Sequence, residues 1–187
     1  MSLDGFTVPG EHNLDNAATA ALLCVAFGAD PARVAAGLPG LEALAHRMQV
    51  VADREGVTWI DDSKATNLDA ARVGISGIDR PAVVLLGGQG KPFPDGSLGF
   101  GVLGQALERH RAVIAFGQDG PLIARELAAA GITATLAPSL ADAVRIAAGC
   151  ARAGDAVLLS PGCASFDEFR DFEHRGDVFA SLAREAT

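Results

Sequence analysis

The chain has few aromatic residues, no excess of positive charge and no long apolar run, and each shortage excludes a class of protein. Tyrosine is absent and aromatic residues make up 5% of the chain, which fits helices packed closely on a sheet better than an all-β sandwich. The formal charge is −8 and no Lys/Arg cluster offsets it, so a nucleic-acid-binding surface is not expected. No run approaches the length of a membrane span and no signal peptide is present, so a membrane partner is not expected either.

Cysteine is also scarce. The three cysteines, Cys24, Cys150 and Cys163, show no paired spacing, and an odd number without a secretory signal indicates reduced thiols in a cytoplasmic protein. No Cys or His pair has the spacing of zinc ligands, so no metal site is expected in this chain. Cys163 stands among small residues with no histidine near it in sequence, which favours a packing role over that of a nucleophile.

What the chain does contain begins with a helical segment. Residues 13–28 and 31–37 predict two helices, the second with Asp30 as N-cap and proline in its first turn, and Leu38–Gly40 is expected to break it. These residues include no strand and cannot bury much surface alone. We therefore expect residues 9–44 to be the end of a preceding domain.

Residues 45–187 predict an α/β domain. Two β-type runs, 48–52 and 57–60, are joined by Asp53–Gly56 and predict a hairpin. Continuous apolar strands such as Ala82–Leu86 imply burial on both faces of a parallel sheet. The expected fold is a Rossmann-like, mostly parallel sheet with one antiparallel edge strand, flanked by helices and preceded by the small helical segment. Further strands are expected at 112–116, 133–136 and 156–160, and helices at 67–77, 97–108, 120–130, 139–151 and 173–185.

Three loops of this domain carry groups that can bind an anion. They are Asp62–Asn67 after the second strand, Gly87–Lys91 after the third and Pro161–Ser165 after the last. Ligands of such sheets bind beyond the carboxyl ends of the strands, and Asp62–Asn67 also opens a helix, whose amino end favours anions. The sequence therefore predicts that the three loops meet at one end of the sheet and hold a phosphate or a carboxylate.

Several of these residues also have a plainer explanation. Asn16 and Asn67 fit helix caps, and Asp62 with Lys64 fits a solvated ion pair. Gly87–Lys91 fits an ordinary turn, and it is not a P-loop because proline follows the lysine where serine or threonine is required.

The aromatic and basic residues near these loops have such alternatives too. The three-residue spacing of Phe166, Phe169 and Phe172 is typical of core packing. His46 fits a structural role, although the planar donors of the adjacent Arg47 could contact phosphate.

Taken together and in unbroken order, these segments resemble the Mur ligases over almost the whole chain. The His46-Arg47 pair and the Asp62–Asn67 motif are fairly specific, and Ser160–Ser165 points to the member of the family that adds D-glutamate. The matching segments are Glu11–Ala17, His46-Arg47, Asp62–Asn67, Leu86–Lys91, Leu159–Asp167 and Phe172–Gly176.

The resemblance implies the end of a central ATPase domain followed by the C-terminal domain of a three-domain enzyme. Such an enzyme ligates D-glutamate to UDP-MurNAc-L-Ala with ATP, through an acyl phosphate, in peptidoglycan synthesis. The UDP-binding domain and the P-loop have no counterpart here. ATP and Mg²⁺ would be bound mainly by the central domain. We therefore expect a fragment that folds but does not turn over ATP alone. We also expect it to be cytoplasmic and monomeric.

Individual roles follow from the same resemblance. Lys64 and Asp62 would act in catalysis, with Lys64 beside the transferred phosphoryl group. Asn16 would contact adenine, Arg47 the phosphates and Asp62 the ribose, and His46 would also belong to the nucleotide site. The residues that would hold D-glutamate are Thr66, Lys91, Ser165, Phe166 and Phe172.

Two details and two alternatives complete the prediction. A helix beginning after Ser165 would add the positive end of its dipole, and Gly162 stands where the family pattern has alanine.

The alternatives are another Mur or folylpolyglutamate-type ligase and a non-catalytic nucleotide- or amino-acid-binding module. A cationic amino acid would need an acid where Lys91 and Ser165 stand, so these residues favour glutamate. An NAD(P)-dependent oxidoreductase is disfavoured because no strand is followed by G-x-G-x-x-G.

Overall fold

The computed structural model describes residues 6, 11–41 and 44–186, and the chain divides into two compact units between Leu44 and Ala45. The first unit contains α1 (Glu11–Ala26), α2 (Pro31–Gly37) and the 3₁₀ turn η1 (Leu38–Gly40). Asp30 caps α2 as predicted, because its Oδ1 accepts a hydrogen bond of 2.9 Å from the N–H of Ala32. Helix α2 ends at Gly37, so the break expected at Leu38–Gly40 is confirmed, and these three residues form a 3₁₀ turn with proline in its first positions.

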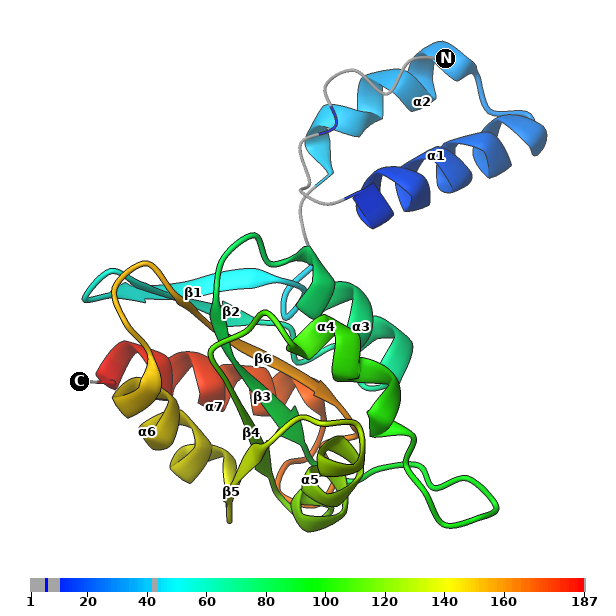
Figure 1. Ribbon diagram of the computed structural model, residues 1–187. Helices are drawn as coiled ribbons and strands as arrows, with labels where there is room; N and C mark the ends of the chain where they lie inside the picture. The colour runs from blue at the N-terminus through cyan, green and yellow to red at the C-terminus, as the bar shows by residue number, and fades with distance from the viewer. Residues whose placement is uncertain (1–5, 7–10, 42–43, 187) are drawn as a thin grey trace. The chain divides into compact units, whose positions relative to one another are not determined.

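The second unit is a six-stranded sheet with helices on both faces (Figure 1), and this confirms the predicted fold class. The strand order is β1-β2-β6-β3-β4-β5, in which only β1 and β2 pair antiparallel. The strands are β1 (Gln49–Arg54), β2 (Val57–Asp61), β3 (Ala82–Gly87), β4 (Ala112–Phe116), β5 (Ala134–Ala137) and β6 (Ala156–Gly162). The helical elements are α3 (Leu68–Gly77), η2 (Phe100–Leu103), α4 (Gly104–Leu107), α5 (Gly120–Ala129), α6 (Leu140–Cys150) and α7 (Phe172–Glu185).

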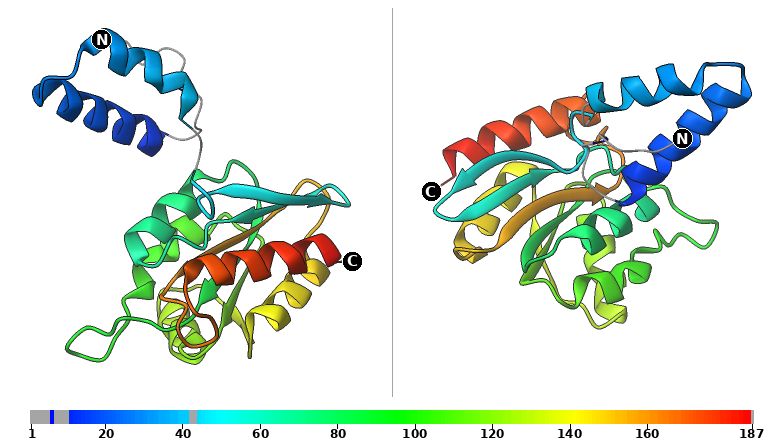
Figure 2. Two further views of the ribbon diagram at one scale, coloured as in Figure 1. Left: turned by 180° about the vertical axis from the view of Figure 1, so that it is seen from behind. Right: turned by 90° about the horizontal axis from the view of Figure 1, so that it is seen from above.

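Strand β3 shows why the sheet is covered on both sides. All six of its residues are buried. Val84 and Leu86 join the core under α3, η2, α4 and α5, whereas Val83 and Leu85 join the core under α6 and α7. Both further views show the helices split in this way between the two faces of the sheet (Figure 2). An uninterrupted apolar strand is what such double coverage requires.

The helix expected at 97–108 is the least accurate prediction of the fold. Regular structure there begins only after Gly99, whose φ is 80°, and it consists of the short elements η2 and α4. Glycine residues at 99, 101 and 104 lower the helix propensity of the segment, which accounts for the shorter helical run.

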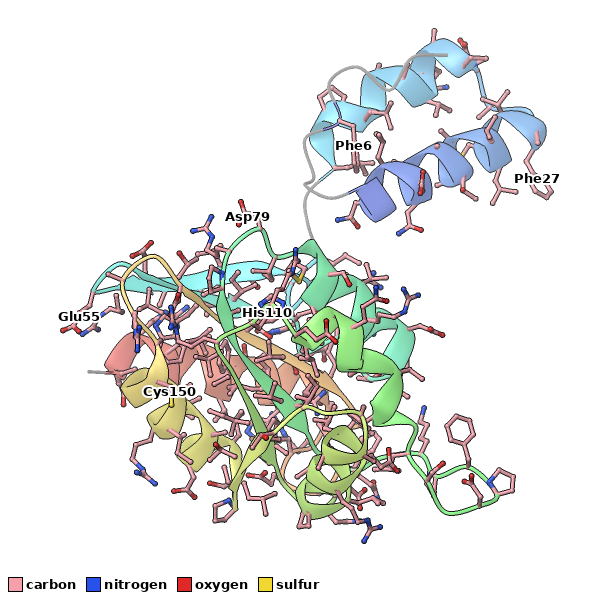
Figure 3. All side chains as sticks on the ribbon, in the orientation of Figure 1. Phe6, Phe27, Glu55, Asp79, His110 and Cys150 are labelled. Atoms are coloured by element: carbon pink, nitrogen blue, oxygen red, sulfur yellow. The ribbon has the colours of Figure 1, made fainter. Side chains whose placement is uncertain are left out.

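The two ends of the sheet carry different residues. Glu55, Asp79, His110 and Cys150 precede β2, β3, β4 and β6, and therefore mark the amino ends of these parallel strands (Figure 3). The loops singled out by the sequence follow β2, β3 and β6 and lie at the opposite, carboxyl end. None of the helices in the described part of the chain is both long and apolar enough to cross a membrane.

Candidate functional site

The three loops meet at one end of the sheet, as the sequence predicts, and we call them the rim loops (Asp62–Asn67, Gly87–Lys91 and Pro161–Ser165). Their strands are neighbours in the order β2-β6-β3. The N–H of Gly162 donates to the carbonyl of Ala65 at 2.8 Å, and Gln89 and Ala164 exchange backbone hydrogen bonds of 2.9 and 3.0 Å. The last rim loop is thus hydrogen-bonded to both of the others.

The two aspartates at the end of β2 are buried and have different partners. Asp61 Oδ2 lies 2.7 Å from His46 Nδ1. Asp62 is 7% exposed, and its Oδ2 accepts a hydrogen bond of 2.8 Å from the hydroxyl of Ser160. The interpretation of Asp62 and Lys64 as a solvated pair is therefore wrong, because the carboxylate is turned into the protein while the lysine is exposed.

Burial raises the pKa of Asp62 from 3.8 to about 6. Hydrogen bonds from the Ser160 hydroxyl and the Met48 backbone oppose this rise, the charge of Asp61 adds to it, and the charge of Arg47 opposes it. A carboxylate that must ionise in a buried position at neutral pH reduces stability, and such groups gather at functional sites.

We expect Asp62→Asn to stabilise the protein more at pH 8 than at pH 4. The pKa in the folded state lies above that in the unfolded state, so the folded state binds the proton more tightly and stability is lost as the pH rises towards about 6. The shift from 3.8 to about 6 corresponds to a loss on the order of 3 kcal/mol. Asparagine cannot ionise and avoids this loss.

Urea unfolding at the two pH values measures the effect. Asp69→Asn, which changes an exposed aspartate of α3, is the matched control and should show no such gain at pH 8. An equal effect of Asp62→Asn at pH 4 and pH 8 would contradict the prediction.

Lys64 and Phe172, which the resemblance gives separate roles, lie in direct contact. The ammonium Nζ of Lys64 is 3.8 Å from the centroid of the Phe172 ring, which is a cation–π geometry. The ring of Phe172 also meets His46 edge-on, with centroids 6.3 Å apart, and its carbonyl accepts a hydrogen bond of 2.8 Å from Ser63 Oγ. The start of α7 is thereby attached to the first rim loop.

Lys91 is exposed at the end of the second rim loop. The preceding N–H, of Gly90, donates to Asp119 Oδ2 at 2.7 Å, and the N–H of Asp119 donates to the carbonyl of Gly88 at 3.1 Å. A fourth loop, Gly117–Gly120 after β4, thus fixes the backbone that carries Lys91. Asp119 was not predicted as a site residue, since its only signal in the sequence is its place in a glycine-flanked turn after an apolar strand.

Ser165 is buried, with 2% exposure, at the end of the third rim loop. Its carbonyl accepts a hydrogen bond of 2.8 Å from the N–H of Phe169, but the turn is not continued as a helix. The next helix, α7, begins at Phe172 because Asp171 Oδ1 accepts from the N–H of His174 at 2.7 Å and caps it. The helix predicted at 173–185 is therefore confirmed as α7, and its amino end lies at Asp171 and not at Ser165 itself.

The other residues near the third rim loop divide between surface and core. Phe166 is 67% exposed, so the core interpretation of its spacing is wrong for this residue, while Phe169 and Phe172 are partly buried. Cys163 is buried, and burial raises the pKa of its thiol to about 12. A thiol that stays protonated at neutral pH agrees with the predicted packing role.

The residues expected to bind nucleotide fall in two places. His46 is held through Nδ1 by Asp61, and its Nε2 lies 3.9 Å from Asp177 Oδ1. Arg47 next to it is exposed. Asn16 is exposed on α1 and belongs to the first unit.

The remaining residues of the first rim loop include a confirmed cap. Asn67 Oδ1 accepts a hydrogen bond of 2.9 Å from the N–H of Ala70 and caps α3. Thr66, beside it, is partly buried.

The backbone conformation at position 162 explains why glycine stands there. Its φ is 69°, a region that side chains rarely adopt, and a Cβ there would lie 3.1 Å from the ring of Phe100. Alanine at this position would require the loop to change its backbone or the ring to move.

The described residues contain no group of three or more His, Cys, Asp or Glu side chains placed to hold a metal ion.

Comparison with known proteins gives consistent matches. A family described as "Mur ligase, glutamate ligase domain" matches residues 46–163. The UDP-N-acetylmuramoylalanine--D-glutamate ligase of Thiobacillus denitrificans is 43% identical over 185 residues, which cover 98% of this chain and 38% of the relative. The ligase of the same name from Rubrobacter xylanophilus is 46% identical over 178 residues, covering 93% and 39%.

A solved structure shows the same fold. The murein peptide ligase Mpl of Psychrobacter arcticus has a TM-score of 0.69 at 17% identity and covers 97% of this chain and 38% of that one. The chain therefore spans less than two fifths of the length of these proteins.

Proposed function

The chain belongs to the Mur ligase family, and we propose that it is the part of a D-glutamate ligase that binds and positions the amino-acid substrate. The observation that carries the proposal is the meeting of the rim loops, because it brings the segments that carry Lys64, Lys91 and Ser165 together at one end of the sheet. A chain with a formal charge of −8 needs such local donors to hold an amino acid that carries two carboxylates.

In this proposal residues 9–44 are the helical end of a central ATPase domain, and residues 45–187 are the C-terminal, amino-acid-binding domain. The division of the chain between Leu44 and Ala45 supports this boundary. ATP and Mg²⁺ are then bound mainly by the rest of the central domain, and the enzyme acts in the cytoplasm in peptidoglycan synthesis. This chain alone folds and does not turn over ATP.

The proposed reaction forms one amide bond at the expense of one ATP. The γ-phosphoryl group passes to the carboxylate of UDP-MurNAc-L-Ala and gives ADP and an acyl phosphate. The ammonium of D-glutamate loses a proton, its amine attacks the acyl carbon, and a C–N bond forms as the C–O bond to phosphate breaks. The protein contributes positioning and stabilisation of charge on the phosphoryl and tetrahedral oxygens.

Lys64 and Asp62, both in the first rim loop, act closest to this chemistry in the proposal. The exposed ammonium of Lys64 stabilises the negative charge of the transferred phosphoryl group. Asp62, Arg47 and His46 contribute to nucleotide binding. For Asn16, which belongs to the first unit, the proposed role is a contact with adenine.

D-Glutamate is held at the other two rim loops and the start of α7. Lys91 and Ser165 pair with its side-chain carboxylate, because an ammonium and a hydroxyl are suitable donors for it. Thr66, Phe166 and Phe172 complete the site; the exposed ring of Phe166 and the partly buried ring of Phe172 are both available to a ligand.

The main alternative is a ligase of the same family that adds a different amino acid. A cationic amino acid such as lysine would need a carboxylate to pair with, and the assigned residues of the rim supply an ammonium and a hydroxyl instead. The second alternative is a module that binds a nucleotide or an amino acid without catalysis. This alternative describes the chain when it is not joined to a P-loop domain.

An acceptor assay on a full-length enzyme that contains this domain tests the proposal. ATP-dependent ligation to UDP-MurNAc-L-Ala is measured with D-Glu, L-Glu and D-Lys. We expect D-Glu to be preferred over D-Lys by at least roughly 10²-fold in kcat/KM, because D-Lys leaves the donors of Lys91 and Ser165 unpaired. Equal use of the three amino acids would refute D-glutamate as the substrate, and no ligation with any of them would refute the reaction.

A further inference from the structure

The most unusual buried group of the domain is the guanidinium of Arg175, on α7. The residue is fully buried, and burial lowers the pKa of its side chain from 12.5 to about 10, so it remains charged at neutral pH. Buried arginines are normally paired with carboxylates, because an unpaired charge in the protein interior is costly.

Arg175 instead binds the backbone and a hydroxyl of two rim loops. Its Nε donates to Ser63 Oγ at 2.9 Å, and its Nη2 donates to the carbonyls of Ser63 at 2.9 Å and Cys163 at 3.1 Å. Ser63 Oγ in turn donates to the carbonyl of Phe172 at 2.8 Å. One side chain therefore joins the first rim loop, the third rim loop and the start of α7.

The second rim loop lies against the same guanidinium. A Cβ added at Gly88, whose φ is 118°, would lie 3.1 Å from Arg175 Nη1 and 2.3 Å from the carbonyl oxygen of Ala164. Glycine is needed here so that the backbone of the second loop can approach both the arginine and the third loop.

The charge of Arg175 is not neutralised by a contact within the described part of the chain. No carboxylate there forms an ion pair with it, and its Nη1 is buried without a hydrogen-bond partner. The charges of Asp167, Asp61 and Glu168 nevertheless favour the charged form of Arg175 without a direct ion pair.

We propose that Arg175 is the positioning residue of the amino-acid site: it holds the three rim loops in one arrangement. This inference rests on the proposed function. Arg175 does not touch the substrate in this proposal, since its free Nη1 is buried. It acts through Ser63, Cys163 and Gly88.

The first test is kinetic and uses Arg175→Lys in the full-length enzyme, with whichever amino acid the acceptor assay identifies. Lysine keeps the charge but lacks the planar fork that binds two loops at once. We expect the KM for the amino acid to rise about tenfold or more, because small misplacements of binding groups have large effects, while the KM for ATP stays within about twofold. Loss of active enzyme with an unchanged amino-acid KM would show a merely structural role and overturn the inference.

The second test needs no catalysis and uses the 187-residue chain. Hydrogen exchange of the backbone amides of Gln89, Ala164 and Gly162 reports the bonds between the rim loops. Arg175→Lys and the milder Ser63→Ala should accelerate their exchange about tenfold or more relative to amides of β4, whereas Arg184→Met, an exposed arginine of the same helix, should not. Unchanged exchange in both variants would overturn the proposal even if D-glutamate proved to be the substrate.

Discussion

Replacing Lys64 with alanine is expected to lower kcat of the full-length enzyme by roughly 10²–10³, which is the usual cost of removing one well-placed donor from a site of this kind. The ammonium of Lys64 is exposed at the rim and lies 3.8 Å from the centroid of the Phe172 ring. It is therefore oriented but free to meet a phosphoryl group. Because charge develops on that group only in the transition state, kcat should fall more than either KM rises.

Steady-state kinetics with ATP and D-glutamate measures this effect. Arg72→Ala, which removes an exposed cation from α3, is the matched control and should leave kcat within about twofold of the wild type. If Lys64→Ala lowered kcat less than threefold, the assignment of Lys64 to the reacting groups would have to be abandoned.

Replacing Lys91 with alanine is expected to raise the KM for D-glutamate about 10- to 100-fold, with the KM for ATP almost unchanged. A hydrogen bond to a charged partner contributes about 1.5–3 kcal/mol, and each 1.4 kcal/mol is about a tenfold change in affinity. The backbone before Lys91 is fixed by Asp119 through Gly90, so the ammonium should meet the ligand without a large loss of loop entropy. Ser165→Ala should have the same selectivity with a smaller effect, because a hydroxyl is a neutral donor.

The same kinetic assay with Pro94→Ala, in the exposed segment that follows Lys91, serves as the control and should leave both KM values unchanged. An equal rise of the two KM values in Lys91→Ala would show that the residue does not belong to the amino-acid site.

Much of the fold was predictable because it depends on local patterns. The apolar run Ala82–Leu86 indicates burial on both faces, and Asp53–Gly56 between two β-type runs indicates a hairpin, whichever residues lie elsewhere. The caps Asp30 and Asn67 accept bonds from residues two and three positions away. Such interactions are complete within a few residues of sequence.

The errors arose where two local signals competed. The prediction of a helix at 97–108 did not account for the loss of helix propensity at Gly99, Gly101 and Gly104. Phe166 has a neighbour at three-residue spacing but lies in a turn, so the helical period does not apply to it.

By itself the sequence determined the α/β architecture and the end of the sheet at which ammonium, hydroxyl and glycine residues gather, because strand direction places every loop that follows a parallel strand at the same end. Only the tertiary structure decided which groups meet there: the burial of Asp62 against Ser160, the contact of Lys64 with Phe172, and the buried charge of Arg175 beneath the rim. The last of these joins Arg175 to Ser63, 112 positions away. The physical reason is that burial and charge pairing depend on which distant segments pack together, and composition and spacing do not record that.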